Sequence, residues 1–161
     1  GGLSGKKGTL LEGGIRVPLL ARWPGQIKAG SKTDHVSAFW DFLPTVCDLA
    51  GVKPPKGLDG ISYAPSLLRS GKQQEHSFLY WAFHERGGRV AVRKGDWKLV
   101  KYNVDKDPLA QWELYDLSKD VGENQDVAAR YPEIVTELSG LASDSEVPSP
   151  IEKFQFQRSI N

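Results

Sequence analysis

The sequence predicts an α/β chain, which becomes α+β when these 161 residues are taken alone. Residues 15–23 are β-branched and apolar with one early charge, a pattern typical of a strand buried on both faces. From residue 77 onward the pattern changes to short, alternating and aromatic segments, and Pro132 then opens an amphipathic segment. We therefore expect the end of a larger sheet, followed by a small antiparallel β-sheet subdomain with a packed C-terminal helix.

The first half is expected to hold a glycine-rich loop over residues 1–14, the strand over 15–23 and a helix from Asp41 to Ala50. Asp41 can act as the N-cap of that helix, and Gly51 falls at its C′ position. A short helix is expected within residues 61–68. We assign residues 1–75 to the incomplete C-terminal end of the α/β domain.

Residues 76–161 are assigned to the antiparallel-sheet subdomain with its helix and tail. Alternation predicts four strands, and a Lys-Gly-Asp turn joins the second to the third. The helix that begins at Pro132 carries its apolar residues on one face. The tail beyond residue 143 is expected to wrap over the surface and to be anchored by Phe154 and Phe156. The four strands are expected at 78–84, 89–93, 97–102 and 113–117.

Charge and composition narrow the classes of partner. The chain has 21 Lys and Arg against 20 Asp and Glu, a formal net charge of +1. Such a balance provides no global field for nucleic acid or anionic lipid, so we expect neither nucleic acid nor membrane as a partner. No apolar run approaches the roughly 20 residues that span a bilayer. The single Cys47 rules out an internal disulfide, and the absence of Met suggests a fragment whose start lies upstream.

The most informative segment runs from Gly5 to Pro18 and reads GKKGTLLEGGIRVP. It resembles the Lys-Gly-Thr, Glu-Gly-Gly, Arg and Pro signature of the type I sulfatases, which are arylsulfatase-like members of the alkaline-phosphatase superfamily. Further matching motifs cover nearly the whole chain up to Ala142. The resemblance implies an alkaline-phosphatase-like sheet and the hydrolysis of sulfate esters. The matching motifs are RWPG from residue 22, DFLPT from 41, LAG from 49, LDG from 58, WKLV from 97 and LYDL from 114.

The resemblance assigns a catalytic, sulfate-binding role to Lys7. A sulfate ester stays negatively charged, and charge builds on the leaving oxygen as the bond breaks. A positioned ammonium group therefore stabilises both the bound substrate and the transition state. The neighbouring Lys6 is expected to be a surface lysine.

A second group of candidate residues is His84, Glu85 and Arg86, which lie between Trp81 and Arg89. An imidazole, a carboxylate and guanidinium groups beside aromatic rings can hold a sulfated sugar by stacking, hydrogen bonds and charge. The alternative is a polar hairpin end whose charges face water. We take His84, Glu85 and Arg86 as substrate-binding candidates, with His84 first.

Other polar residues are interpreted as structural. Glu12 is expected to accept backbone N–H groups in a tight turn, and Arg16 is expected to form a structural ion pair. For His76, a loop residue, the sequence suggests no function. Cys47 is not the nucleophile, because the Cys-x-Pro-x-Arg motif of the family is absent from this sequence. The resemblance implies that formylglycine and calcium belong to the full-length enzyme and are supplied by upstream residues, so we assign no metal ligand here.

The function expected from these motifs is that of a C-terminal fragment of a sulfatase, inactive alone, with the N-terminal catalytic portion of the same protein as its partner. The substrate class is a sulfated small molecule or glycan. Two alternatives stay open: a non-catalytic sulfoglycan-binding module, and a phosphodiesterase or phosphonate hydrolase of the same superfamily. The family suggests a periplasmic, secreted or lysosomal-type compartment.

Overall fold

The computed structural model describes residues 2–107 and 109–156 of the chain. They fall into two compact units, one combining the described residues up to Val17 with those from Phe78 onward and the other comprising Pro18–Ser77. The assignment of residues 1–75 to the end of a larger α/β domain stays a prediction. None of the helices among the described residues is long and apolar enough to cross a membrane.

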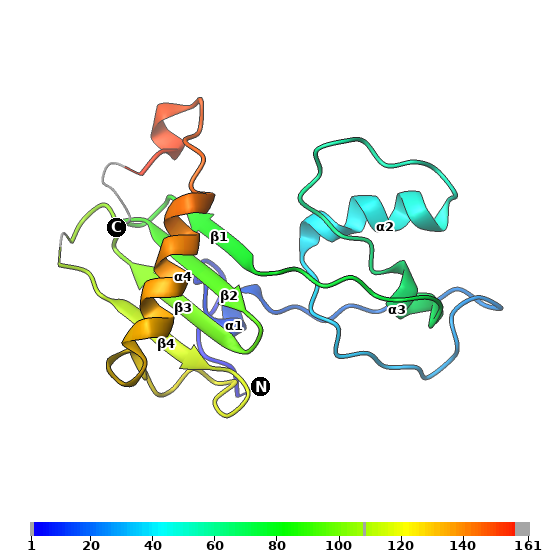
Figure 1. Cartoon of the computed structure of the whole chain (residues 1–161), viewed down its shortest axis with the longest axis horizontal. Helices are drawn as coiled ribbons and strands as arrows, with labels where there is room; N and C mark the ends of the chain where they lie inside the picture. Colours follow the sequence, from blue (N-terminus) through cyan, green and yellow to red (C-terminus); the bar gives the residue numbers. More distant parts are fainter. Residues whose placement is uncertain (1, 108, 157–161) are drawn as a thin grey trace. The chain divides into compact units, whose positions relative to one another are not determined.

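A four-stranded antiparallel sheet forms the centre of the first unit (Figure 1). Its strands follow chain order, as the alternating sequence pattern predicts, and the short connections favour neighbouring strands. Strands β2 and β3 are joined at the pair Lys94–Trp97 by a two-residue turn, in which Gly95 has a φ of 58°. This positive φ explains the glycine in the predicted turn. The strands are β1 (Leu79–Phe83), β2 (Arg89–Lys94), β3 (Trp97–Tyr102) and β4 (Trp112–Asp116).

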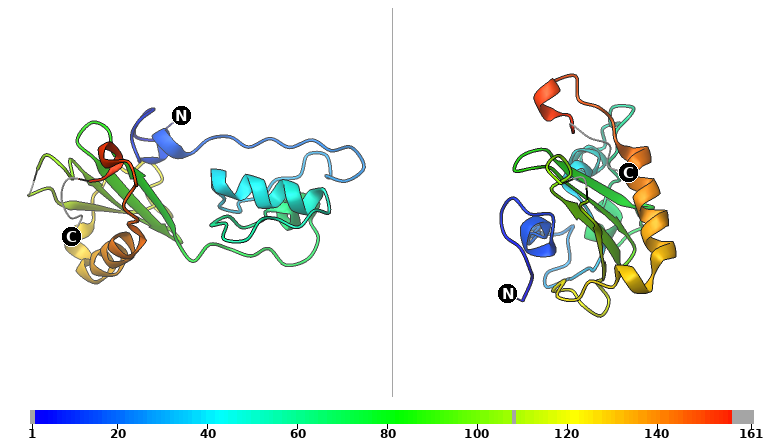
Figure 2. Two further views of the ribbon diagram at one scale, coloured as in Figure 1. Left: turned by 90° about the horizontal axis from the view of Figure 1, so that it is seen from above. Right: turned by 90° about the vertical axis from the view of Figure 1, so that its left-hand side faces the viewer.

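The two faces of this sheet are covered by different segments (Figure 2). Helix α4 (Pro132–Ser145) lies on one face, and its Leu138 and Ala142 are buried against the sheet. The N-terminal segment with α1 (Glu12–Ile15) lies on the opposite face, where Leu10 is buried. The sheet is thus enclosed on both sides, and the N-terminal loop that carries Lys7 is part of one layer.

The second unit holds the 3₁₀ turn η1 (Phe39–Asp41) and the helices α2 (Phe42–Leu49) and α3 (Ala64–Leu68). Both helices were predicted, as was Gly51, which follows α2 with a φ of 66°. The prediction that Asp41 caps α2 with its side chain is wrong.

The Asp41 side chain is fully buried and binds one group close by in the sequence and two that lie far away. Its carboxylate accepts hydrogen bonds from the backbone N–H groups of Ala38 at 2.7 Å and Ile61 at 2.8 Å. The ring of His76 lies 2.8 Å from the same carboxylate. Asp41 therefore ties the start of α2 to two later loops, and His76, for which no function was predicted, is one of its partners.

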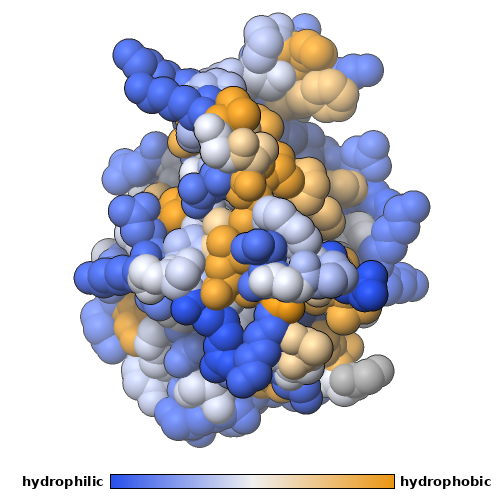
Figure 3. All heavy atoms as spheres, turned by 90° about the vertical axis from the view of Figure 1, so that its right-hand side faces the viewer, coloured by the Kyte–Doolittle hydropathy of each residue, from blue (hydrophilic) through white to orange (hydrophobic). Residues whose placement is uncertain are grey.

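The strand predicted over residues 15–23 is absent. Ile15 ends α1, and the following residues pair with none of the four strands of the described part of the chain. A doubly buried strand needs neighbours at both edges and layers over both faces, which the described residues do not provide. Apolar side chains of this run are instead exposed, and Leu20 is 94% accessible. Figure 3 shows apolar side chains among hydrophilic ones at the molecular surface.

The tail beyond α4 forms the 3₁₀ turn η3 (Glu152–Phe154). Phe156 packs against the core cluster between the sheet and α4, as predicted for a tail anchor. Phe154 is 42% exposed, so the prediction that it anchors the tail is wrong. The rest of the predicted tail, residues 157–161, lies outside the described residues.

Candidate functional site

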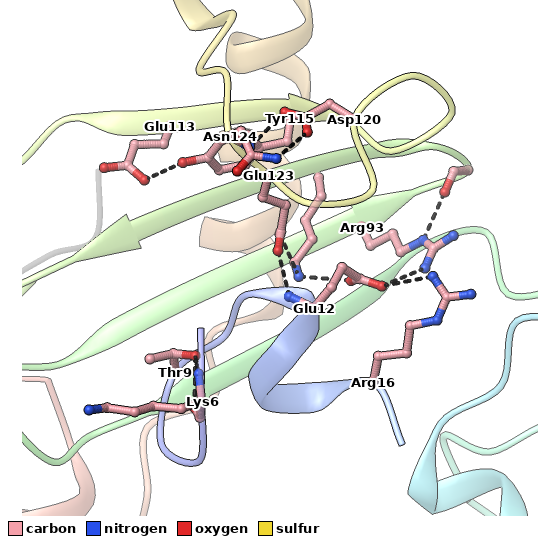
Figure 4. Close-up of polar contacts among 12 residues, drawn as sticks. Lys6, Thr9, Glu12, Arg16, Arg93, Glu113, Tyr115, Asp120, Glu123 and Asn124 are labelled. Carbon is pink, nitrogen blue, oxygen red and sulfur yellow. Dashed lines mark hydrogen bonds and ion pairs between the residues drawn. The ribbon is translucent and has the colours of Figure 1, made fainter. Parts of the chain in front are cut away.

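Lys7 lies in a closed turn of the N-terminal segment. The N–H of Thr9 donates to the carbonyl of Lys6 at 2.9 Å, and the Thr9 hydroxyl donates to the same carbonyl at 2.9 Å. The N–H of Lys6 in turn donates to the Thr9 hydroxyl at 3.1 Å (Figure 4). The Lys7 side chain is exposed, so its ammonium group is available to an anion.

Helix α1 holds this turn through glycines. The N–H of Gly13 donates to the carbonyl of Ser4 at 2.7 Å. A Cβ on Gly13 would lie 2.5 Å from that carbonyl oxygen, and a Cβ on Gly14 would lie 2.3 Å from the carbonyl oxygen of Thr9. Both positions exclude a side chain, which explains why the Glu-Gly-Gly sequence accompanies the Lys7 turn.

A buried ion cluster fixes α1 to the sheet. Lys98 of β3 is fully buried, and its ammonium lies 2.9 Å from a carboxylate oxygen of Glu12 and 2.9 Å from one of Glu123. The backbone N–H of Glu12 donates to the other Glu123 oxygen at 2.5 Å. Figure 4 shows the Glu123 side chain directed at the start of α1. Burial raises the pKa of Glu123, and the hydrogen bond from Lys98 opposes that effect.

Two arginines complete the surroundings of Glu12. Its second carboxylate oxygen lies 3.7 Å from Arg16 and 3.8 Å from Arg93 of β2. The predicted ion pair of Arg16 is therefore present. The partners predicted for Glu12 were wrong, because its side chain binds cationic side chains rather than backbone N–H groups. Its buried position between α1 and the sheet makes it the link between the Lys7 turn and β3.

The β1–β2 hairpin end carries the other sequence candidates. Arg86, Gly87 and Gly88 have φ values of 58°, 92° and 75°, so three successive residues adopt the left-handed region. Arg86 and Glu85 are exposed, whereas His84 is half-buried. The His84 ring lies against the ring of Phe156, with 4.3 Å between the ring centroids.

The structure brings this hairpin to the Lys7 turn. A Cβ built on Gly8 would lie 3.3 Å from an Nη atom of Arg86, so the guanidinium group passes directly over the residue that follows Lys7. Two of the four candidates, Lys7 and Arg86, thus come from segments almost 80 residues apart, and the Arg86 guanidinium lies against the residue next to Lys7. An ammonium and a guanidinium group each form charge-assisted hydrogen bonds with a tetrahedral anion.

A further cation lies at the start of β2. Arg89 is 7% exposed, and its guanidinium carbon lies 5.0 Å from the centroid of the Phe83 ring and 6.0 Å from that of Tyr102. Its Nε atom has no hydrogen-bond partner within residues 2–107 and 109–156. Phe83 at the end of β1 and Tyr102 at the end of β3 therefore hold this arginine, as cation–π contacts allow.

Within the described residues, no group of three or more His, Cys, Asp or Glu side chains is placed to hold a metal ion.

Comparison with known proteins shows which family this arrangement belongs to. A sequence model of the family "N-sulphoglucosamine sulphohydrolase, C-terminal" matches residues 5–144. The chain belongs to this family. Arylsulfatase A of Bos taurus is 37% identical over 161 residues, covering 85% of this chain and 32% of that protein. The chain thus spans about a third of the length of this curated relative. The family match and this identity confirm the predicted resemblance to sulfatases.

Solved structures agree with this membership of the sulphohydrolase family. The crystal structure of Ps i-CgsB superimposes with a TM-score of 0.73 at 30% identity, covering 86% of this chain and 30% of that one. The structure of BT4656, solved with its substrate D-glucosamine-2-N,6-O-disulfate, gives a TM-score of 0.64 at 27% identity, covering 86% and 28% of the two chains. The predicted fold class, helices with an antiparallel sheet as found in alkaline-phosphatase-like sulfatases, is therefore confirmed.

Proposed function

We propose that the complete protein containing this chain is a sulfatase, a hydrolase of sulfate esters, and that this chain supplies part of the substrate site. The observation that carries the proposal is the position of the Arg86 guanidinium over Gly8, beside Lys7. Membership of the sulphohydrolase family supplies the reaction class.

In this proposal Lys7 is the catalytic residue of the chain. Its ammonium binds a sulfate oxygen and offsets the charge that builds up as the ester bond breaks. A charge-assisted hydrogen bond of this kind contributes about 1.5–3 kcal/mol. The closed turn and α1 hold the Lys7 backbone in place before substrate arrives, and such preorganisation makes a charge effective in the transition state.

The hairpin end would bind the rest of the substrate. Arg86 provides a second cation close to the sulfate, His84 provides an imidazole edge, and Glu85 provides a carboxylate for sugar hydroxyls. The relatives support a sulfated glycan as substrate class: BT4656 was solved with a disulfated glucosamine, and Ps i-CgsB with k-i-k-neocarrahexaose.

Type I sulfatases use formylglycine as the nucleophile and calcium to neutralise the sulfate. We infer that residues of the complete protein outside this chain supply both, and that this N-terminal catalytic portion is the chain's main partner. The exposed apolar run that includes Val17, Leu19 and Leu20 is consistent with such a partner, because exposed apolar side chains close together in the chain can mark an interaction surface.

The test measures how fast the purified complete protein hydrolyses 4-nitrophenyl sulfate. The parallel substrates are 4-nitrophenyl phosphate and the 4-nitrophenyl monoester of phenylphosphonate. We expect release of 4-nitrophenol from the sulfate at the highest kcat/KM of the three. A preference for the phosphonate or phosphate would assign the protein to the phosphoester branch of the superfamily. Binding of a sulfated glycan with no turnover of any ester would indicate a binding module.

A further inference from the structure

The tail after α4 lies beyond the part of the chain that matches the family, because the match ends at residue 144. The tail has its own local hydrogen bonds. The N–H of Ile151 donates to the Ser149 hydroxyl at 3.1 Å, and the side-chain amide of Gln155 donates to the Ser149 carbonyl at 2.6 Å. These bonds fold residues 149–155 into a compact bend, drawn in red beyond α4 in Figure 1, and Phe156 follows directly.

Phe156 contacts the hairpin end at two points. Its ring lies against His84 with a centroid distance of 4.3 Å and an interplanar angle of 33°. A Cβ built on Gly88 would lie 3.0 Å from the nearest ring carbon of Phe156. Gly88 therefore leaves the space that the ring occupies, and a side chain there would displace the tail.

The contact is specific to one of the two tail phenylalanines. Phe156 also packs against the core cluster, whereas Phe154 is 42% exposed, and its ring contact is with its neighbour Lys153. The Phe156 ring lies against the ring of His84, whose side chain is half-buried. A ring fixed in this way loses less conformational freedom when a ligand binds.

We infer that Phe156 is a positioning residue that fixes the His84 ring for the sugar part of a sulfated glycan, which makes the tail a specificity element of the site. This inference rests on the proposed sulfatase function and deepens it. Sulfate itself is held by the cations beside Gly8, so Phe156 affects recognition of the sugar and leaves recognition of the sulfate group unchanged.

The experiment compares Phe156→Ala, Phe156→Tyr and the control Phe154→Ala in the complete protein. Steady-state kcat and KM are measured with 4-nitrophenyl sulfate and with the fastest-hydrolysed of three sugars: glucosamine 6-sulfate, D-glucosamine-2-N,6-O-disulfate and k-i-k-neocarrahexaose. Phe156→Ala should raise KM for the sugar about three- to tenfold, the range of one aromatic pair, with little change in kcat. It should leave 4-nitrophenyl sulfate unaffected.

Phe156→Tyr should restore the sugar KM because it keeps the ring, and Phe154→Ala should change neither substrate. An equal loss on both substrates after Phe156→Ala, or no loss on the sugar, overturns the inference. A wild-type protein that hydrolyses 4-nitrophenyl sulfate but none of the sugars also overturns it, while leaving the proposed function standing. A wild-type protein that hydrolyses none of the four contradicts the proposed function and, with it, the inference.

Discussion

Replacing Lys98 with Met tests how the Lys7 turn is held against the sheet. The substitution keeps an unbranched side chain one atom shorter but removes an ammonium that lies 2.9 Å from both Glu12 and Glu123. Both carboxylates are almost fully buried, so water cannot replace the lost partner. Removing one partner of a buried ion pair costs about 3–5 kcal/mol. Because about 1.4 kcal/mol is a factor of ten, local opening around Glu12 should become about 10²- to 10⁴-fold more frequent.

Amide hydrogen exchange in the complete protein measures this opening directly, using peptides that cover residues 10–17. Lys119→Met is the matched control, because Lys119 is 79% exposed and paired with Asp116 at the surface. It should leave exchange in this segment unchanged. Adding Glu123→Gln to Lys98→Met should recover part of the protection against exchange, since one of the two buried carboxylates that lost its ammonium partner is then replaced by a neutral amide. If exchange in residues 10–17 were the same in both lysine variants, the buried cluster would not be what fixes the turn.

Three other outcomes follow from the same structure. The isolated 161-residue chain should show no sulfatase activity, which an assay of the purified fragment with 4-nitrophenyl sulfate checks and which any turnover above background would refute. His84→Ala in the complete protein should weaken the sugar substrate by several-fold while sparing the aryl sulfate, and equal losses in kcat/KM on both would contradict its role. Burial raises the pKa of Tyr80 and of Tyr102 to about 12, so the folded state disfavours their ionisation. The contribution of these two tyrosines to stability should therefore be constant below pH 10 and be lost as pH rises from about 10 through 12. A difference absorbance titration in which Tyr80→Phe or Tyr102→Phe removes ionisation near pH 10 would disprove this.

The antiparallel sheet and α4 could be predicted because their signals are local. Alternation marks each strand, a two-residue turn joins β2 to β3, and Pro132 occupies the first position of α4. The strand expected over residues 15–23 failed for the opposite reason. The segment is apolar, but a strand buried on both faces depends on neighbouring strands and covering layers that the described residues do not supply.

Residues of the candidate site could be predicted only where they belong to a recognisable sequence motif. The Lys7 turn and the hairpin residues were recognised one by one, but nothing in the sequence places Arg86 over Gly8, because the contact joins distant segments. The burial of Lys98 was also missed. Its position between Trp97 and Leu99 in a strand was an available signal, yet the partners, Glu12 and Glu123, lie 86 and 25 residues away in the sequence.

Phe156 and Asp41 show the same limit. The sequence suggested an anchor and a helix cap, and both residues act through partners that only the fold brings near. Asp41 binds the N–H of Ile61 and the ring of His76 rather than its own helix.

The most direct measurement of the central claim is kcat/KM for 4-nitrophenyl sulfate in the complete protein with Lys7→Ala and with Lys6→Ala. Both lysines are exposed members of one turn, so truncation of either leaves no cavity and should not change the fold. If Lys7 holds the sulfate through the transition state, Lys7→Ala should lower kcat/KM by about 10²- to 10³-fold. Lys6→Ala should stay close to the wild-type value. Near-normal activity of Lys7→Ala, or an equal loss in the two variants, would contradict the account.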